Sequence, residues 1–184
     1  MVIFMESILA QERIGTIDKS LHYVAEFDGS CLVYLVERQE SLFVLKMAPL
    51  HDEWGVGYTA RIKDHLTREQ EVLERVKGLR RVADLEQVYT PSYDAIALLK
   101  KYVEGDALSG RISNPTTKKQ LEGTVCGLHG RGISNLDLER PENVIISPDG
   151  NTATLFDFGK CKIQGVDGDY ESMREWDLMC LDRL

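Results

Sequence analysis

The segment from Asn143 to Asp157 limits the possible folds more than any other part of this sequence. Two short apolar runs, residues 144–146 and 153–156, flank residues 147–151, which read Ser-Pro-Asp-Gly-Asn and favour a tight turn. This pattern predicts a β-hairpin, in which the two outer ends lie side by side. The side chains of Asn143 and Asp157 are therefore expected to converge.

An amide oxygen and a carboxylate at one place predict a particular kind of metal site. Mg²⁺ prefers hard oxygen ligands, keeps several waters and takes only one or two carboxylates together with substrate phosphates. Asn143 and Asp157 are therefore the candidate metal ligands. Asp137 lies six residues before Asn143, so it can reach the same place and accept a proton from a substrate hydroxyl group.

The first half of the chain has mostly the pattern of strands. Apolar runs at residues 32–36 and 42–45 predict a hairpin, and residues 85–104 predict two more strands. Residues 48–66 lack a clear period. They are expected to form a long connection with room for one short helix.

A helix is expected to begin at about residue 68. Thr67 and Gln70 match the capping box, in which both side chains satisfy exposed amides of the first helical turn. Apolar residues then recur at three- and four-residue intervals as far as Leu79, so one stripe of this helix faces a core. Glu69 lies along the same stripe.

The second half predicts helices on both sides of the hairpin. Residues 107–112 and 116–129 have helical patterns, and Asn114 followed by proline is a start signal for the second of them. The apolar spacing in residues 171–184 predicts a terminal helix. The fold class is therefore α+β.

Composition and charge exclude several classes of protein. The chain has 184 residues, enough for one hydrophobic core. Its formal net charge of −8 opposes the counterion release that supplies most of the affinity for nucleic acid, so no direct nucleic-acid binding is expected. No apolar stretch approaches the roughly 18 residues of a membrane span, and the apolar run at residues 1–4 is too short for a signal sequence. We expect a cytoplasmic protein that does not bind membranes.

Cysteine usage is consistent with a reducing compartment. The sequence has no close pair of the C-x-x-C kind, and each cysteine lies in or beside an apolar run. We therefore expect buried, reduced thiols at Cys31, Cys126, Cys161 and Cys180.

Several segments resemble the sequence motifs of protein kinases. Residues 128–133 and 137–144 look like the catalytic loop and the residues before it, and residues 157–159 look like the D-F-G motif. Upstream, residues 43–46 resemble the strand that carries the phosphate-binding lysine, and residues 102–105 resemble the hinge. Finding these segments in the right order is far more specific than any one of them.

The resemblance implies a bilobal, protein-kinase-like fold with ATP and Mg²⁺ as cofactors. The implied N-lobe is β-rich and spans residues 1–104, and the implied C-lobe is truncated, mainly helical and spans residues 105–184. Asp177 on the last predicted helix stands where the family anchors the backbone of the catalytic loop. The residues implied for nucleotide binding, besides those assigned below, are Gly29, Ser30, Lys101, Tyr102 and Val103.

The resemblance also implies a division of roles. Lys46 binds the ATP phosphates and Glu69 holds Lys46. Asp157 and Asn143 bind ATP through Mg²⁺, and Asp137 orients the attacking hydroxyl group. Asp137, Lys46 and Glu69 are thus the candidate catalytic residues.

Departures from the usual pattern indicate a minimal, atypical kinase. Residues 27–32 offer one glycine where the family's phosphate-binding loop has three, and residues 135–137 read Asn-Leu-Asp in place of His-Arg-Asp. An extra residue separates Asp137 from Asn143, and no A-P-E signature follows. In its brevity the chain resembles RIO-type proteins, the small kinase associated with tRNA threonylcarbamoylation, and lipopolysaccharide-core kinases.

The sequence leaves three functions open. The first is an Mg·ATP-dependent kinase that acts on a protein Ser/Thr hydroxyl or on a small-molecule hydroxyl. The second is a pseudokinase that presents a surface to a partner protein, and the third is an ATPase that drives a partner's work. The acceptor of the phosphate separates the third from the first.

Overall fold

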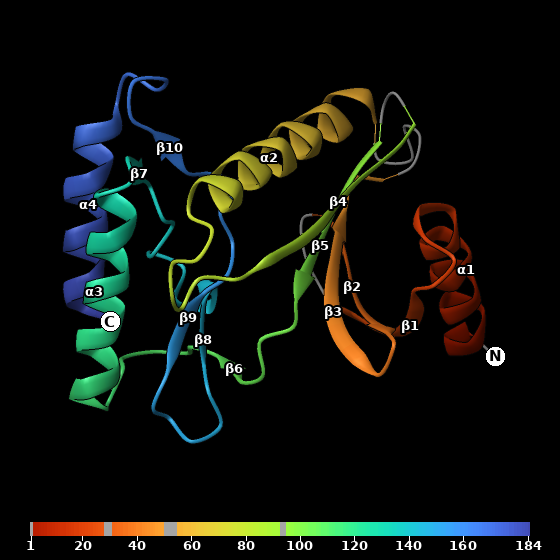
Figure 1. Ribbon diagram of the computed structural model, residues 1–184, viewed down its shortest axis with the longest axis horizontal. Coiled ribbons are helices and arrows are strands. Elements are labelled where there is room, and N and C mark those ends of the chain that lie inside the picture. Colours follow the sequence, from red (N-terminus) through yellow and green to blue (C-terminus); the bar gives the residue numbers. More distant parts are fainter. Residues whose placement is uncertain (1, 28–30, 50–54, 93–94) are drawn as a thin grey trace. The chain divides into compact units, whose positions relative to one another are not determined.

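The computed structural model describes residues 2–27, 31–49, 55–92 and 95–184. These residues form two compact units, one made of Met1–Thr67 and Leu85–Tyr102 and the other of Arg68–Asp84 and Val103–Leu184. Antiparallel strands dominate the first unit, and helices with short strands make up the second, so the predicted α+β class is confirmed (Figure 1). The lobe boundary at residue 104 stays a prediction.

The sheet of the first unit consists of β1 (His22–Phe27), β2 (Leu32–Arg38), β3 (Ser41–Met47), β4 (Leu85–Ser92) and β5 (Ala95–Lys101). The strand order is β1-β2-β3-β5-β4, and every pair is antiparallel. The predicted hairpin is β2 and β3, and the two further predicted strands are β4 and β5. The sequence pattern does not predict β1, because no residue of this strand is buried and its apolar alternation is weak.

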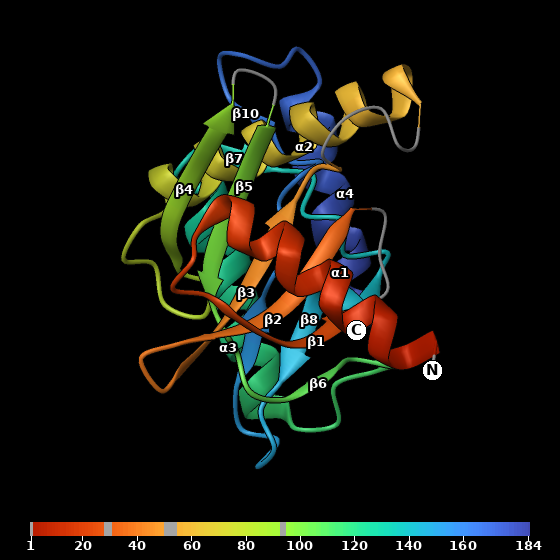
Figure 2. The same cartoon turned by 90° about the vertical axis from the view of Figure 1, so that its right-hand side faces the viewer.

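Helix α1 (Val2–Ile17) covers one face of this sheet (Figure 2). Ala10 and Ile14 pack with Tyr34 and Leu45 in one core cluster of the first unit. Over residues 7–17, where burial is described, the buried residues are Ala10 and Ile14. Such a narrow stripe does not stand out as a helical period in the sequence.

The first half of helix α2 (Val56–Arg75) covers the opposite face. Ile62 and Leu66 pack with Leu98 in a second cluster, whereas Leu99 belongs to the cluster beneath α1. Successive residues of a strand point to opposite faces. The sheet is therefore covered on both sides within the first unit.

The prediction that this helix begins at about residue 68 is wrong, because it begins at Val56. Thr67 and Gln70 lie inside the helix, where Gln70 Nε2 donates to Glu74 Oε1 at 2.8 Å instead of capping a first turn. The buried positions of the earlier turns, Thr59, Ile62 and Leu66, have helical spacing, but one of them is polar and glycines precede them. Packing against the sheet stabilises the helix there, and the local sequence pattern does not reveal this contact.

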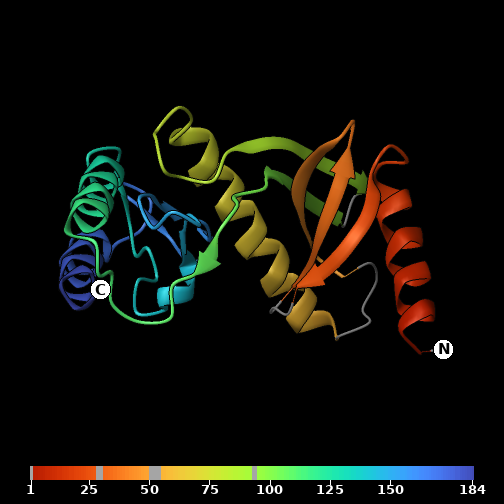
Figure 3. The ribbon, with the colours of Figure 1, turned by 90° about the horizontal axis from the view of Figure 1, so that it is seen from below.

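The second unit contains α3 (Pro115–His129) and α4 (Tyr170–Arg183), which lie side by side (Figure 3) and confirm two predicted helices. None of the helices in the described part of the chain is long and apolar enough to cross a membrane. The short strands form two small sheets, one in the order β6-β8-β9 and one that pairs β7 with β10. Their bounds are Asp106–Ala107 for β6, Ile133–Ser134 for β7, Val144–Ile146 for β8, Ala153–Leu155 for β9 and Lys162–Ile163 for β10.

The helix predicted for residues 107–112 is wrong, since these residues begin in strand β6 and continue as an irregular segment. Strand β6 pairs with β8, and the amide of Leu108 donates to the carbonyl of Val144 at 2.8 Å. Gly105 precedes the strand with φ 145°, a backbone conformation that suits glycine. Backbone amides of this segment therefore donate to the hairpin and not to carbonyls within a helix.

Asn114 caps α3, as the sequence predicts. Its Oδ1 accepts the amides of Thr116 at 3.0 Å and Thr117 at 3.5 Å. Its Nδ2 donates to the carbonyl of Gly150 at 3.4 Å and to Asn151 Oδ1 at 3.2 Å, in the turn between β8 and β9. We expect Asn114→Ala to lower the free energy of unfolding in urea by about 1 kcal/mol, because the first-turn amides lose their acceptor. Asn114→Ser keeps a capping oxygen and is expected to lose less; equal losses in the two variants would contradict the capping role.

All four cysteines are unbridged, as predicted. Cys31, Cys161 and Cys180 are buried, but Cys126 is exposed, so the prediction of burial is wrong for that residue. Cys126 lies on α3 next to the buried Val125. The apolar run around it belongs to the other side of the helix.

Candidate functional site

The hairpin of β8 and β9 brings the backbones of Asn143 and Asp157 together, as predicted. Val144 lies opposite Leu155 in the antiparallel pair. The amide of Phe156 then donates to the carbonyl of Asn143 at 3.1 Å. Asp157 follows directly after this last hydrogen bond.

The amide group of Asn143 is buried and has a defined orientation. Its Nδ2 donates to the backbone carbonyl of Asp137 at 3.1 Å, and the residue is only 8% exposed. Two backbone hydrogen bonds connect Asp137 to the 3-10 turn η1 (Pro141–Asn143): the amide of Arg140 donates to the Asp137 carbonyl, and the amide of Asn143 donates to the Arg140 carbonyl. Because Nδ2 is used as a donor, Oδ1 is the atom of this amide that suits a cation.

The carboxylate of Asp157 is oriented by the turn that follows the hairpin. Its Oδ1 accepts the amide of Gly159 at 3.1 Å, and the intervening Phe158 is buried. A carboxylate has about four lone-pair sites, so this hydrogen bond leaves capacity for a metal ion. Among the described residues, no group of three or more His, Cys, Asp and Glu side chains is arranged to hold a metal. The oxygen donors of Asn143 and Asp157 fit an Mg²⁺ ion that is also bound by phosphate oxygens.

Two basic side chains lie beside the carboxylate of Asp137. Its Oδ2 is 2.9 Å from Lys160 Nζ and 3.8 Å from Arg140 Nε. Asp137 has φ 54° and Asn135 has φ 56°, so the backbone takes left-handed conformations on both sides of Leu136. Asn135 Nδ2 donates to the carbonyl of Lys160 at 2.6 Å. The sequence interpretation did not single out Lys160, although its place directly after the D-F-G segment was a usable signal.

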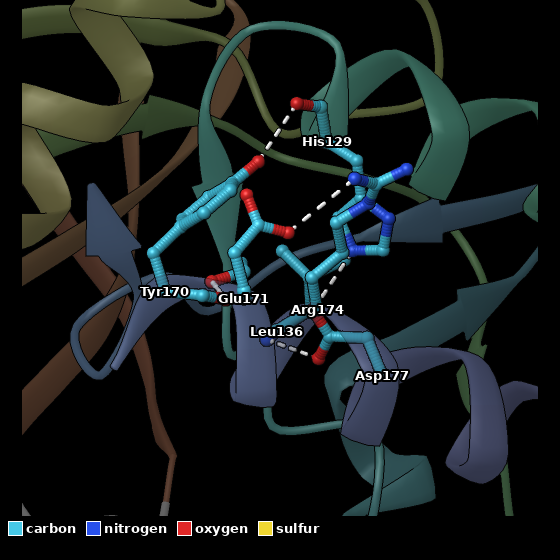
Figure 4. Close-up of polar contacts among 7 residues, drawn as sticks. His129, Leu136, Tyr170, Glu171, Arg174 and Asp177 are labelled. Atoms are coloured by element: carbon cyan, nitrogen blue, oxygen red, sulfur yellow. Dashed lines mark hydrogen bonds and ion pairs between the residues drawn. The ribbon is translucent and has the colours of Figure 1, made fainter. Parts of the chain in front are cut away.

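Asp177 on α4 anchors the loop that carries Asp137 (Figure 4). Its Oδ1 accepts the amide of Leu136 at 2.7 Å, and its Oδ2 lies 3.0 Å from His129 Nε2. The hydroxyl of Tyr170 donates to the carbonyl of His129 at 2.9 Å. The predicted anchoring by Asp177 is confirmed, whereas the contributions of His129 and Tyr170 were not predicted.

The charges of four carboxylates act on the buried thiol of Cys161. Burial raises the pKa of Cys161 well above its ordinary value, and the negative charges of Asp177, Asp157, Glu69 and Asp137 raise it further. Glu69 belongs to the part of α2 that is in the second unit, and it is fully buried. These four acidic residues come from α2, two loops and α4 of the second unit.

The remaining predicted residues lie elsewhere in the chain, and their nucleotide-binding roles stay predictions, as does the pairing predicted for Glu69. Lys46 is a buried polar residue. Gly29 and Ser30 fall outside the described residues. The predicted nucleotide-binding residues that the structure describes are Lys46 on β3, Lys101 at the end of β5, and the following Tyr102 and Val103.

Comparisons with known proteins concern the fold. No protein-family model matches the chain, and no curated protein matches it. Among solved structures, the kinase PK-1 of Cydia pomonella granulovirus is similar with a TM-score of 0.67 and 16% sequence identity, over 94% of this chain and 69% of the viral chain. Its likeness covers both units described above. The chain therefore has a protein-kinase-like fold.

Proposed function

We propose that the chain is a minimal, atypical kinase that transfers the γ-phosphoryl group of Mg·ATP to a hydroxyl group of a protein or a small molecule. One observation carries this proposal: Asn143 Nδ2 is bonded to the Asp137 carbonyl while the hairpin holds Asp157 next to Asn143. The candidate proton acceptor and the two candidate oxygen ligands thus lie on backbone segments that hydrogen bonds join. The kinase-like fold supports this interpretation.

The proposed mechanism rests on positioning and charge. Phosphoryl transfer needs little covalent chemistry from a protein, so orientation and electrostatic stabilisation account for most of the catalysis. A bound Mg²⁺ would offset the negative charge of the phosphate groups. Asn143 Oδ1 and the Asp157 carboxylate are the proposed ligands for this ion. Asp137 orients the acceptor hydroxyl and takes its proton, and Lys46 is assigned to the ATP phosphates by the kinase resemblance.

A nucleotide-binding module that transfers no phosphate is the second candidate. The ion pair between Lys160 and Asp137 favours it, because Oδ2 of the proposed proton acceptor is already in contact with an ammonium group. An ATPase differs from the kinase only in using water as the acceptor.

Incubation with γ-labelled ATP and Mg²⁺ separates these functions. We expect label to appear in the protein itself, in an added protein or in a small-molecule hydroxyl from a cell lysate, and we expect chelation of Mg²⁺ by EDTA to prevent it. Label found only in free phosphate would identify an ATPase. Nucleotide binding without any release or transfer of label would establish the second candidate and contradict the proposal.

A further inference from the structure

Lys160 combines a fixed backbone with a partly free side chain. Its carbonyl accepts Asn135 Nδ2 at 2.6 Å, and strand β10 begins two residues later, where Lys162 pairs with Ser134 of β7. Its ammonium lies 2.9 Å from Asp137 Oδ2, yet 43% of the side chain is exposed. The ammonium group of Lys160 therefore contacts Asp137 from a fixed point of the backbone, and its side chain can still rotate.

The loop that carries Asp137 offers little positive charge of its own. Its basic residue is Arg140, whose Nε is 3.8 Å from Asp137 Oδ2 and whose side chain is 56% exposed. Glu139 and Glu142 on the same segment are exposed and negative. Negative charge on the γ-phosphoryl oxygens needs a cation in the transition state. Of the two cations beside Asp137, Lys160 is the nearer.

A lysine in this position can reach a reacting phosphoryl group. A general base lies about 3 Å from the hydroxyl oxygen whose proton it accepts, and that oxygen lies about 3 to 3.5 Å from phosphorus when the reactants are aligned. Lysine has a flexible four-carbon stem. An ammonium that contacts Asp137 therefore needs only side-chain rotation to contact the γ-phosphoryl oxygens.

We propose that Lys160 is a catalytic residue of the proposed reaction, on which this inference rests, and that its ammonium moves from Asp137 to the γ-phosphoryl oxygens when ATP binds. In the transfer step the acceptor hydroxyl oxygen forms a bond to the γ-phosphorus. The bond between that phosphorus and the bridging oxygen breaks, and ADP leaves with the electron pair. The hydroxyl proton goes to Asp137, whose Oδ2 the ammonium has left. Lys160 gives up no proton and compensates the charge on the transferred group.

The first test compares nucleotide affinities and needs no turnover. Equilibrium binding is measured in Mg²⁺ with ADP and with the non-hydrolysable β,γ-imido analogue of ATP. We expect Lys160→Met to weaken binding of the analogue by about tenfold, as for the loss of one charged hydrogen bond, and to leave ADP affinity unchanged. Lys160→Arg retains the charge and is expected to keep most of the preference for the analogue.

Lys162→Met is the matched control, because Lys162 lies in the same segment but is 3.7 Å from Asp169 and not beside Asp137. It is expected to change neither affinity. Equal weakening of both nucleotides in Lys160→Met would indicate a merely structural role, and an unchanged affinity for the analogue would also overturn the inference.

Turnover separates this inference from the proposed function. If wild type transfers label, we expect Lys160→Met to lower kcat by roughly 100-fold, and a normal rate would overturn only the role of Lys160. If wild type binds nucleotide without transfer, the proposed function fails, while the comparison of analogue with ADP still decides whether Lys160 contacts the γ-phosphoryl group. A wild-type protein that binds neither nucleotide would overturn both.

Discussion

Asp157→Asn is expected to lower the rate of phosphoryl transfer by roughly 100- to 1000-fold. The substitution keeps the size of the side chain and an oxygen that accepts the amide of Gly159, which now bonds to Asp157 Oδ1 at 3.1 Å. It removes the negative charge, and a neutral amide holds Mg²⁺ far less strongly than a carboxylate does. Initial rates with γ-labelled ATP over a range of Mg²⁺ concentrations measure the effect. Raising Mg²⁺ is expected to restore part of the rate.

The control for this variant is Asp182→Asn, which removes the same charge from an exposed position on α4. Its rate is expected to equal that of wild type. Both variants are expected to unfold in urea at the wild-type midpoint, because neither changes a buried apolar contact. Transfer by Asp157→Asn at the wild-type rate would exclude the proposed metal site.

Asp177→Ala is expected to lower the free energy of unfolding by about 3 kcal/mol. The Asp177 carboxylate is 1% exposed. Its removal leaves the amide of Leu136 and Nε2 of His129 without the oxygens that they now contact at 2.7 and 3.0 Å. Urea denaturation followed by circular dichroism measures the loss.

Two further variants serve as references for the loss of stability in Asp177→Ala. Asp177→Asn keeps an oxygen for the Leu136 amide and is expected to lose roughly half as much stability as the alanine variant. Asp182→Ala on the exposed side of the same helix is expected to stay within about 0.5 kcal/mol of wild type. A loss below about 1 kcal/mol in Asp177→Ala would show that the contacts of Asp177 do not hold the loop.

The sequence predicts those parts of the fold that local chemistry decides. Residues 147–151 form the expected turn because Asp149 accepts the Asn151 amide at 3.0 Å and the Ser147 hydroxyl at 2.5 Å. These same bonds lower the pKa of Asp149 to about 2. The cap of α3 at Asn114 depends on its own side chain in the same way. From such local features the convergence of Asn143 with Asp157 could be predicted.

Contacts between distant segments decide the parts that were predicted wrongly or not at all. The early turns of α2 are helical because Ile62 and Leu66 pack against the sheet. Strand β6 replaces a predicted helix because β8 offers it a partner. Lys160 joins the candidate site through the pairing of β7 with β10, which sets the loops of Asn135 and Lys160 next to each other. Sequence spacing alone contains none of these pairings.

The hairpin that ends at Asn143 and Asp157 is also attached to α3 at its tip. Thr117 Oγ1 donates to the carbonyl of Gly150 at 2.8 Å, and Asn114 Nδ2 shares that acceptor. Tilting the hairpin would therefore break contacts of the residues that start the helix. The start of α3 thus limits the movement of the hairpin that lies between the two proposed oxygen ligands. We therefore expect a weaker cap on α3 to lower the affinity of the proposed site for a divalent cation.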